Sequence, residues 1–419
     1  MATDLRLRGL SDIDPETVPL PHGTEVVTRV DRLAGERRIP QGALGRVVRI
    51  DGDLVRVLVV GVGEATYARD EVAPSRAGQL RFARRREAAW SALAPCVVLE
   101  AVVGSRAWGL SDESSDTDLR GVFVLPFPWT GALAPVPRDL ISADGSSAYW
   151  EIGKAVRQAL RADPNTLEVL FAPAADVRDP IGGWLLEMRD AFVSAEIYGS
   201  FGRYALSQTR KLRQSLRLAE HRALLFDWLR DDPSMTLDAA AARLAGATLQ
   251  SMPGEADRLH RARDYIVQLY HSLHDQGLLP HASFAALVQF SRSGADPLDL
   301  PRELRPKNAY NLLRLIATAV TWLRTGAVDL RITEPLRSRL LAIKRGELVL
   351  ASVLDQADEM AAELEEARRD TRLPARADVA RADLLLRRVR EEVARRWLER
   401  APGPFGLEAP TLPEAQWEP

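Results

Sequence analysis

Two aspartates, Asp116 and Asp118, stand two residues apart at the start of an apolar run from Leu119 to Leu125. If this run is a strand, the alternation of side chains directs both carboxylates to one face. Such a pair suits a hard divalent cation, above all Mg²⁺, which prefers oxygen ligands and leaves room for water and phosphate. Two such ions close together can activate an attacking hydroxyl and neutralise a departing pyrophosphate. The pair predicts a metal site; the alternative is a hairpin with capping aspartates.

A Gly-Ser turn precedes the acidic pair by ten residues. The apolar run from Cys96 to Val103 predicts a buried strand that ends at Gly104-Ser105. Glycine lets the backbone approach a ligand closely, and the Ser105 hydroxyl and the following amides can face an anion. Arg106 comes next and could reach a phosphate. The turn therefore predicts a phosphate cradle beside the carboxylates.

The elements that position these residues lie in residues 81–180, which mix strands and helices. A helix is expected from Arg81 to Ala89, a further strand from Ala148 to Ile152, and a helix from Gly153 to Arg161. Pro164 interrupts the pattern before another apolar run. We interpret this region as a catalytic core with a mixed sheet, and the whole chain as an α+β multidomain protein.

Residues 1–80 form short valine-rich runs, with Asp51-Gly52-Asp53 as a hairpin turn. Several short strands in so few residues predict a small barrel or a curled sheet, similar to an SH3-like β module. Such modules bind RNA or protein partners. A spacer or docking role is the alternative.

Leucine and alanine recur at helical spacing after residue 180, which predicts a helical domain over 181–400. The proline-rich residues 401–419 are expected to be a flexible tail. The single cysteine, Cys96, lies in an apolar run and is expected in a core, which excludes internal disulfides and cysteine-rich zinc sites.

The charge balance is nearly neutral, at −2, so no global positive field attracts nucleic acid and any contact must use a local patch. No apolar run approaches the ~18 residues of a membrane span, and the N-terminus has no signal-peptide pattern. The expected location is the cytoplasm, without membrane contact.

The combination of a Gly-Ser turn, a spacer of about ten residues and Asp-x-Asp between apolar residues resembles the polymerase β nucleotidyltransferase superfamily. Further motifs resemble its branch associated with RNA ligases in RNA-repair operons. The resemblance covers about residues 95 to 375 and leaves the N-terminal module outside. Its motifs are Gly104-Ser105-x-Ala107-x-Gly109, Ser115-Asp116-x-Asp118-x-Arg120-Gly121, Tyr149-Trp150-Glu151-Ile152, Asn165-x-x-Glu168-x-Leu170-Phe171 and Lys307-x-x-Tyr310-x-x-x-Arg314.

The resemblance implies a transfer of a nucleoside monophosphate from a nucleoside triphosphate (NTP) to an acceptor hydroxyl, with RNA as the expected acceptor. Two Mg²⁺ or Mn²⁺ ions are implied, held by Asp116, Asp118 and a third carboxylate. We assign the third position to Glu151, with Asp144 as the alternative, because the intervening loop leaves the register open. Glu151 could instead pair with a basic residue of the helix that it opens.

Nucleotide contacts are expected from Gly104, Ser105, Arg106 and Arg120. Arg120 shares the strand face of the aspartates, where it could bind a triphosphate or simply neutralise them. On the predicted helix from Lys307 to Arg324, nucleotide contacts are expected from one stripe, formed by Lys307, Tyr310 and Arg314. An exposed amphipathic face is the alternative. The family's helical motif often has histidine where this chain has Asn308 and Asn311.

Two other functions fit the same motifs. The acceptor could be a protein or small-molecule hydroxyl, or the fold could sense nucleotides or RNA without turnover. The intact carboxylates argue against a sensor, because a protein without catalysis has no need for clustered acids.

Overall fold

The computed structural model describes residues 18–411 except 36, 60–61, 113–114, 133–135, 249–253, 276–277 and 293–305. The chain forms two compact units. The first comprises Met1–Arg203, Ala317–Ser338 and Glu363–Pro419, and the second comprises Tyr204–Ile316 and Arg339–Ala362.

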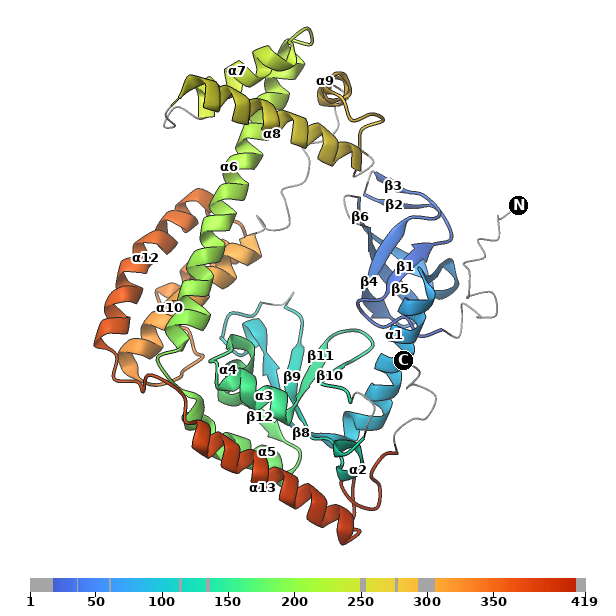
Figure 1. The fold of residues 1–419 in the computed structure, drawn as a ribbon, viewed down its shortest axis with the longest axis vertical. Helices are drawn as coiled ribbons and strands as arrows, with labels where there is room; N and C mark the ends of the chain where they lie inside the picture. The colour runs from blue at the N-terminus through green and yellow to red at the C-terminus, as the bar shows by residue number, and fades with distance from the viewer. Residues whose placement is uncertain are drawn as a thin grey trace. The chain divides into compact units, whose positions relative to one another are not determined.

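The N-terminal part of the first unit is a five-stranded antiparallel sheet in the order β6-β5-β4-β1-β7 (Figure 1). Buried and exposed residues alternate along β5, so one face covers a core that contains Val26, Val57 and Tyr67. Among the described residues the outer strands β6 and β7 do not pair, so the sheet is open and the barrel alternative is wrong. The strands are β1 (Glu25–Thr28), β4 (Leu44–Asp51), β5 (Leu54–Val59), β6 (Gly63–Ala68) and β7 (Val72–Pro74), with a separate ribbon of β2 (Arg32–Ala34) and β3 (Arg37–Ile39).

The central sheet of the first unit has the order β10-β11-β9-β8-β12. Strand β11 runs parallel to β9 and the other pairs are antiparallel, so the sheet is mixed, as predicted. The apolar run before the Gly-Ser turn is β8, in which six of seven residues are buried. The strands are β8 (Val97–Val103), β9 (Asp118–Phe123), β10 (Asp139–Ile141), β11 (Ser147–Glu151) and β12 (Ala175–Val177).

Helix α1 (Ala77–Leu93) contacts both β7 and β10 and so joins the two sheets (Figure 1). Its Trp90 stacks on Tyr149 of β11 with ring centroids 5.6 Å apart. Further helices pack on the central sheet: α3 (Ile152–Ala159) contacts β9 and β11, and α4 (Pro164–Phe171) and α5 (Pro180–Glu187) both contact β8. The short helix α2 (Phe127–Thr130) follows β9.

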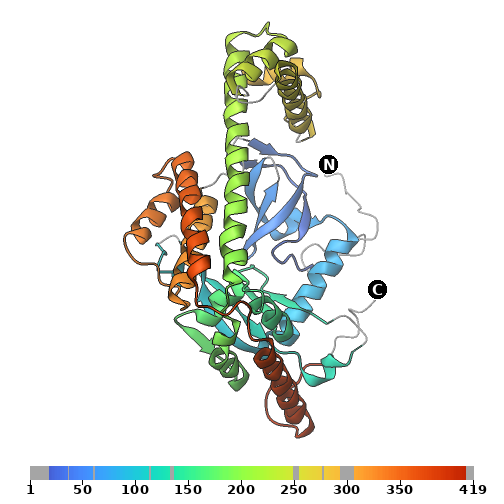
Figure 2. The ribbon, with the colours of Figure 1, turned by 60° about the vertical axis from the view of Figure 1, so that its left-hand side comes forward.

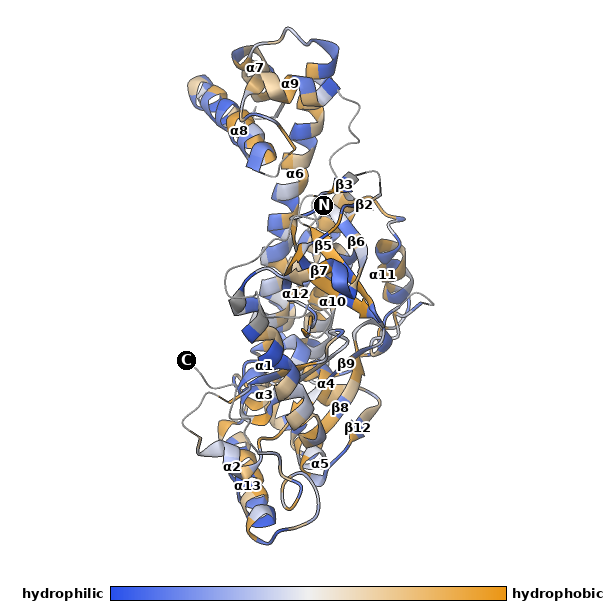
Figure 3. Ribbon diagram, turned by 90° about the vertical axis from the view of Figure 1, so that its right-hand side faces the viewer, coloured by the Kyte–Doolittle hydropathy of each residue, from blue (hydrophilic) through white to orange (hydrophobic). Residues whose placement is uncertain are grey.

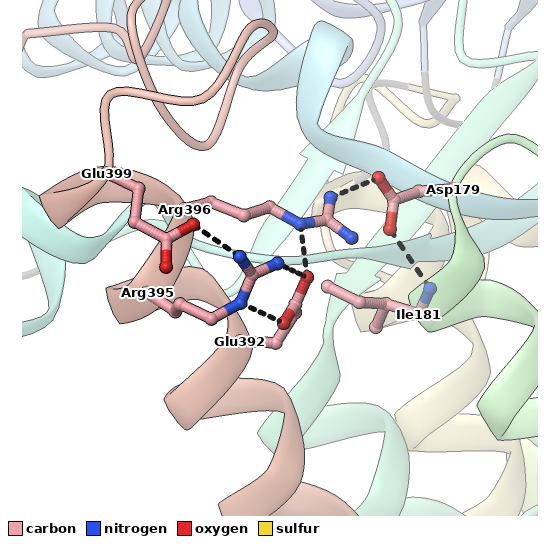
Figure 4. A network of polar contacts seen from close by, with 6 residues as sticks. All are labelled: Asp179, Ile181, Glu392, Arg395, Arg396 and Glu399. Carbon is pink, nitrogen blue, oxygen red and sulfur yellow. Dashed lines mark hydrogen bonds and ion pairs between the residues drawn. The ribbon is translucent and has the colours of Figure 1, made fainter.

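The C-terminal helix α13 (Val379–Leu398) packs against α2, α3 and α5. Figure 4 shows the polar network that fixes it. Asp179 caps α5 by accepting from the Ile181 amide at 3.0 Å and also binds Arg396 at 2.7 Å. Glu392 accepts from both Arg395 and Arg396, and the Arg395 hydrogen bond is the main cause that lowers the Glu392 pKa to about 2. This network ties α13 to α5, which packs on the central sheet.

The second unit is helical. Helix α6 is a single helix of 28 residues, and α7 and α9 pack against it (Figure 2). Hydrophilic and hydrophobic residues both occur along helix α8 (Figure 3). The helices are α6 (Tyr204–Asp231), α7 (Leu237–Thr248), α8 (Glu255–Asp275), α9 (Phe284–Arg292), α10 (Pro306–Thr325), α11 (Leu336–Lys344) and α12 (Leu350–Asp370), of which α10, α11 and α12 each extend into the first unit.

None of the helices in the described part of the chain combines the length and the apolar character that a bilayer span requires.

Candidate active site

The Gly-Ser turn follows directly on β8. Gly104 has φ +70°, a left-handed conformation that favours glycine, and the next residues form a short 3₁₀ turn. A Cβ added to Gly104 would lie 3.5 Å from the Asp118 Oδ2 atom. The turn therefore runs immediately beside a carboxylate of the acidic pair, as the sequence predicts.

A buried carboxylate holds this turn in place. Oε1 of Glu168, on α4, accepts from the Gly104 amide at 2.6 Å and from the Trp108 indole nitrogen at 2.8 Å. Glu168 is only 8% exposed. Glu168 belongs to one of the sequence motifs, in which no role was expected for it, although an acid inside an apolar helical run indicates a buried polar contact.

Residues distant in the sequence support the same turn from the other side. The Trp108 ring stacks on Trp322 of α10 at 6.3 Å between centroids. The Arg337 Nε atom donates to the Gly109 carbonyl at 2.9 Å. All of these residues belong to the first unit, so the turn is fixed on several sides.

The acidic pair lines a pocket of about 330 Å³. Asp118 is the first residue of β9, whereas Asp116 lies in the loop two residues before it. Their side chains are exposed by 46% and 79% respectively. The pocket is lined by His22, Val48, Arg49, Ile50, Asp51, Asp116, Thr117, Asp118, Asp144, Gly145 and Ser146.

Asp144 thus lies in the same pocket as the pair. It occupies the turn before β11, and the Leu119 amide on β9 donates to the Ser146 carbonyl at 2.9 Å, which brings the turn beside the start of β9. Burial opposes ionisation of Asp144, but hydrogen bonds from Ser142 and Ser146 outweigh it and lower its pKa. Asp144 is therefore a carboxylate at neutral pH.

Glu151 lies at the opposite end of the sheet, and the assignment of the third carboxylate to it requires correction. In the parallel pairing of β11 with β9, Glu151 stands beside Phe123, five residues from Asp118. At about 3.3 Å per residue this is roughly 16 Å along the strand. The Glu151 carboxylate instead caps α3, accepting from the amides of Gly153 at 2.9 Å and Lys154 at 3.0 Å. The basic partner near it is Arg138, at 3.8 Å.

The predicted arginines, Arg120 and Arg106, donate hydrogen bonds to backbone carbonyls near the acidic pair. Arg120 donates to the carbonyls of Leu119 and Ser146, at 2.8 and 3.1 Å, and stands 3.7 Å from Asp118. Arg106 donates to the Ser115 carbonyl at 2.9 Å and so supports the loop that carries Asp116. Both contacts fit a role in positioning the acids, and a contact of either arginine with phosphate stays a prediction.

The helical stripe of Lys307, Tyr310 and Arg314 lies on α10 within the second unit. Lys307 is exposed, whereas Tyr310 is buried. Their contact with a nucleotide stays a prediction.

The N-terminal sheet supplies one wall of the pocket, which the sequence analysis missed. Arg49 of β4 brings its Nη1 atom to 4.0 Å from Asp116 Oδ1. His22 lies on the same wall, and burial followed by the Arg86 charge lowers its pKa, so the imidazole is neutral at pH 7. Since no local motif links Arg49 to Asp116, only the fold reveals this wall.

The oxygen donors of the pocket fit a hard cation. Among the described residues, no three His, Cys, Asp or Glu side chains are grouped so that they could hold a metal ion by themselves. Mg²⁺, however, usually binds one or two carboxylates and takes its other ligands from substrate phosphates and water. Asp116 and Asp118 match that donor set on an open pocket wall.

Comparison with known families confirms the resemblance seen in the sequence. Residues 79–225 match the family described as RNA repair pathway DNA polymerase beta family. The match begins in α1, includes the Gly-Ser turn and three of the four aspartates that line the pocket, Asp116, Asp118 and Asp144, and ends within α6. No curated protein and no solved structure gave a match. The N-terminal sheet and the stripe on α10 lie outside the matched segment.

Proposed function

We propose that this protein transfers a nucleoside monophosphate from an NTP to a hydroxyl of RNA and releases pyrophosphate. The observation that carries the proposal is the meeting of Asp116 and Asp118 in one pocket, beside the Gly104 turn, within the segment that matches the RNA-repair polymerase β family.

In the proposed reaction an acceptor oxygen attacks the α-phosphorus, and the bond between that phosphorus and the bridging oxygen to the β-phosphate breaks. Asp116 and Asp118 would hold the divalent cation. When bound, such a cation neutralises phosphate charge and makes a hydroxyl more acidic. Gly104 and Ser105 would bring backbone amides and a hydroxyl to the phosphates.

Asp144 replaces Glu151 in our proposal as the third acid. It is ionised and faces the same pocket, so it can accept a hydrogen bond from the attacking hydroxyl and orient it. Because hydrogen bonds lower its pKa, it is a weak base, and orientation is its main contribution. The hydroxyl proton then leaves to solvent as the new ester bond forms.

The test incubates the full-length protein with Mg²⁺ or Mn²⁺, each of the four NTPs labelled at the α-phosphate, and RNAs with free 3′-hydroxyls. We expect labelled RNA and equimolar pyrophosphate. Asp116→Asn should reduce the rate by about a hundredfold or more, because even the loss of a residue that only supports a metal ligand lowers activity by about 10–100-fold. Asp139→Asn is the matched control, because Asp139 is a half-exposed carboxylate of the same sheet that pairs with Lys154. Labelling of added proteins or small molecules, with none of RNA, would contradict the acceptor assignment.

A further inference from the structure

The N-terminal sheet contributes side chains to the carboxylate pocket although it lies outside the segment that matches the family. Strand β4 supplies four consecutive lining residues, from Val48 to Asp51. The pocket walls therefore come from two separate sheets.

The junction between the two sheets is built from specific contacts. The His22 amide donates to the Ala143 carbonyl at 2.6 Å. Arg86 of α1 donates to the carbonyls of His22 and Ser142 and so bridges both sides. Gly145 has φ +80°, and a Cβ there would meet the His22 ring at 2.7 Å. These contacts hold the segment around His22, which precedes β1, against the turn that carries Asp144.

Arg49 is the cationic side chain that β4 presents to this pocket. Its Nε atom donates to Asp51 Oδ1 at 2.8 Å, and its Nη1 atom lies 4.0 Å from Asp116 Oδ1. The guanidinium thus stands between an anchoring carboxylate and a candidate metal ligand. A half-exposed arginine in such a place can shift to an anion that enters the pocket, because its planar fork matches phosphate oxygens.

The negative charge of the pocket has to be offset by a cation before a phosphate can bind there. Asp51, Asp116, Asp118 and Asp144 all line it, so a phosphate can enter only if positive charge offsets them. A divalent cation on Asp116 and Asp118 offsets the negative charge on one side of the pocket. Arg49 offsets the negative charge on the wall that the N-terminal sheet forms.

We propose that Arg49 binds a phosphate group of the substrate, which makes the N-terminal module part of the transfer site rather than a separate docking module. The proposal rests on the function proposed above. The ligand chemistry is a phosphate, from either the NTP triphosphate or the RNA backbone.

The test compares wild type, Arg49→Ala, Arg49→Lys and the control Arg38→Ala. Arg38 is an exposed arginine of the same module that pairs with Asp31 and does not line the pocket. We measure kcat and KM for the NTP and for RNA, and equilibrium binding of inorganic tripolyphosphate and of a short single-stranded RNA. Arg49→Ala should raise one KM about tenfold or more, as loss of a charged hydrogen bond would, with a smaller change in kcat. Arg49→Lys should restore part of the loss, and Arg38→Ala should match wild type.

The KM that rises identifies the source of the phosphate, the NTP or the RNA. If wild type transfers nucleotides and Arg49→Ala keeps both KM values and both affinities, the role of Arg49 is refuted while the proposed function stands. If no transfer occurs but Arg49→Ala weakens tripolyphosphate or RNA binding, the proposed function fails and the phosphate site stands. Failure of wild type both to transfer nucleotides and to bind either probe refutes both.

Discussion

Replacement of Glu168 by alanine should destabilise the protein and disturb the site together. The Glu168 Oε1 atom accepts two hydrogen bonds, from the Gly104 amide at 2.6 Å and from the Trp108 indole at 2.8 Å. Both bonds are made to a carboxylate in a buried position, where each contributes about 1.5–3 kcal/mol. Relief from burying the carboxylate offsets part of their sum. We expect Glu168→Ala to lower the free energy of unfolding by about 3–4 kcal/mol.

The conservative variant separates the hydrogen bonds from the charge. Glu168→Gln keeps an oxygen acceptor for both donors, so we expect a loss of only about 1 kcal/mol. Since the turn lies beside Asp118, misplacement by about 1 Å in Glu168→Ala should also lower kcat by about a hundredfold. Glu168→Gln should recover most of that rate.

Urea denaturation followed by circular dichroism measures the stability, and labelled-nucleotide transfer measures the rate. Glu187→Ala, which removes an exposed carboxylate from α5, is the control and should change neither. An unfolding free energy for Glu168→Ala within about 0.5 kcal/mol of wild type, the range of ordinary surface substitutions, would refute the reasoning.

Three further predictions follow from the contacts. Gly145→Ala should lower the melting temperature, because alanine costs about 1–2 kcal/mol in a left-handed conformation and its Cβ also meets the His22 ring. An unchanged melting temperature would contradict the packing of His22 against this turn. Because the Glu392 pKa falls from 4.5 to about 2 on folding, its network stabilises fully above pH 4.5 and is lost as pH falls towards 2. Glu392→Gln should flatten that part of a stability–pH profile, and equal slopes would show that Glu392 is not responsible. Asp144→Asn should reduce kcat by about a hundredfold while Glu151→Gln keeps it, and the reverse order in a kinetic assay would restore Glu151 as the third acid.

The local parts of the site could be predicted because their signals are local. A buried strand, a glycine that adopts positive φ and two acids before the next strand all follow from residues close together in the chain. For this reason the sequence places Gly104 beside Asp118 correctly.

The proposed third acid, Asp144, could not be chosen over Glu151 from the sequence because its place beside Asp118 depends on long-range register. Glu151 and Asp144 stand at opposite ends of β11, and only the parallel pairing with β9 decides which end lies beside Asp118. The local sequence also places Glu151 at the start of a helix, and in the structure its carboxylate caps α3.

The contact of Arg49 with Asp116 and the position of α13 could not be predicted from the sequence for a related reason. Arg49 reaches Asp116 through the packing of two sheets, and Arg396 binds Asp179, which lies 217 residues earlier in the chain. A periodic pattern predicts that α13 is a helix but contains no information on the partner that its polar residues bind.

Transfer from ATP labelled at either the α- or the γ-phosphate, in wild type and in Asp118→Asn, distinguishes nucleotidyl transfer from phosphoryl transfer. We expect RNA to acquire the α-label and not the γ-label in wild type, and Asp118→Asn to lose this labelling. Transfer of the γ-label, or α-labelling that persists undiminished in Asp118→Asn, would contradict nucleotidyl transfer by this pocket.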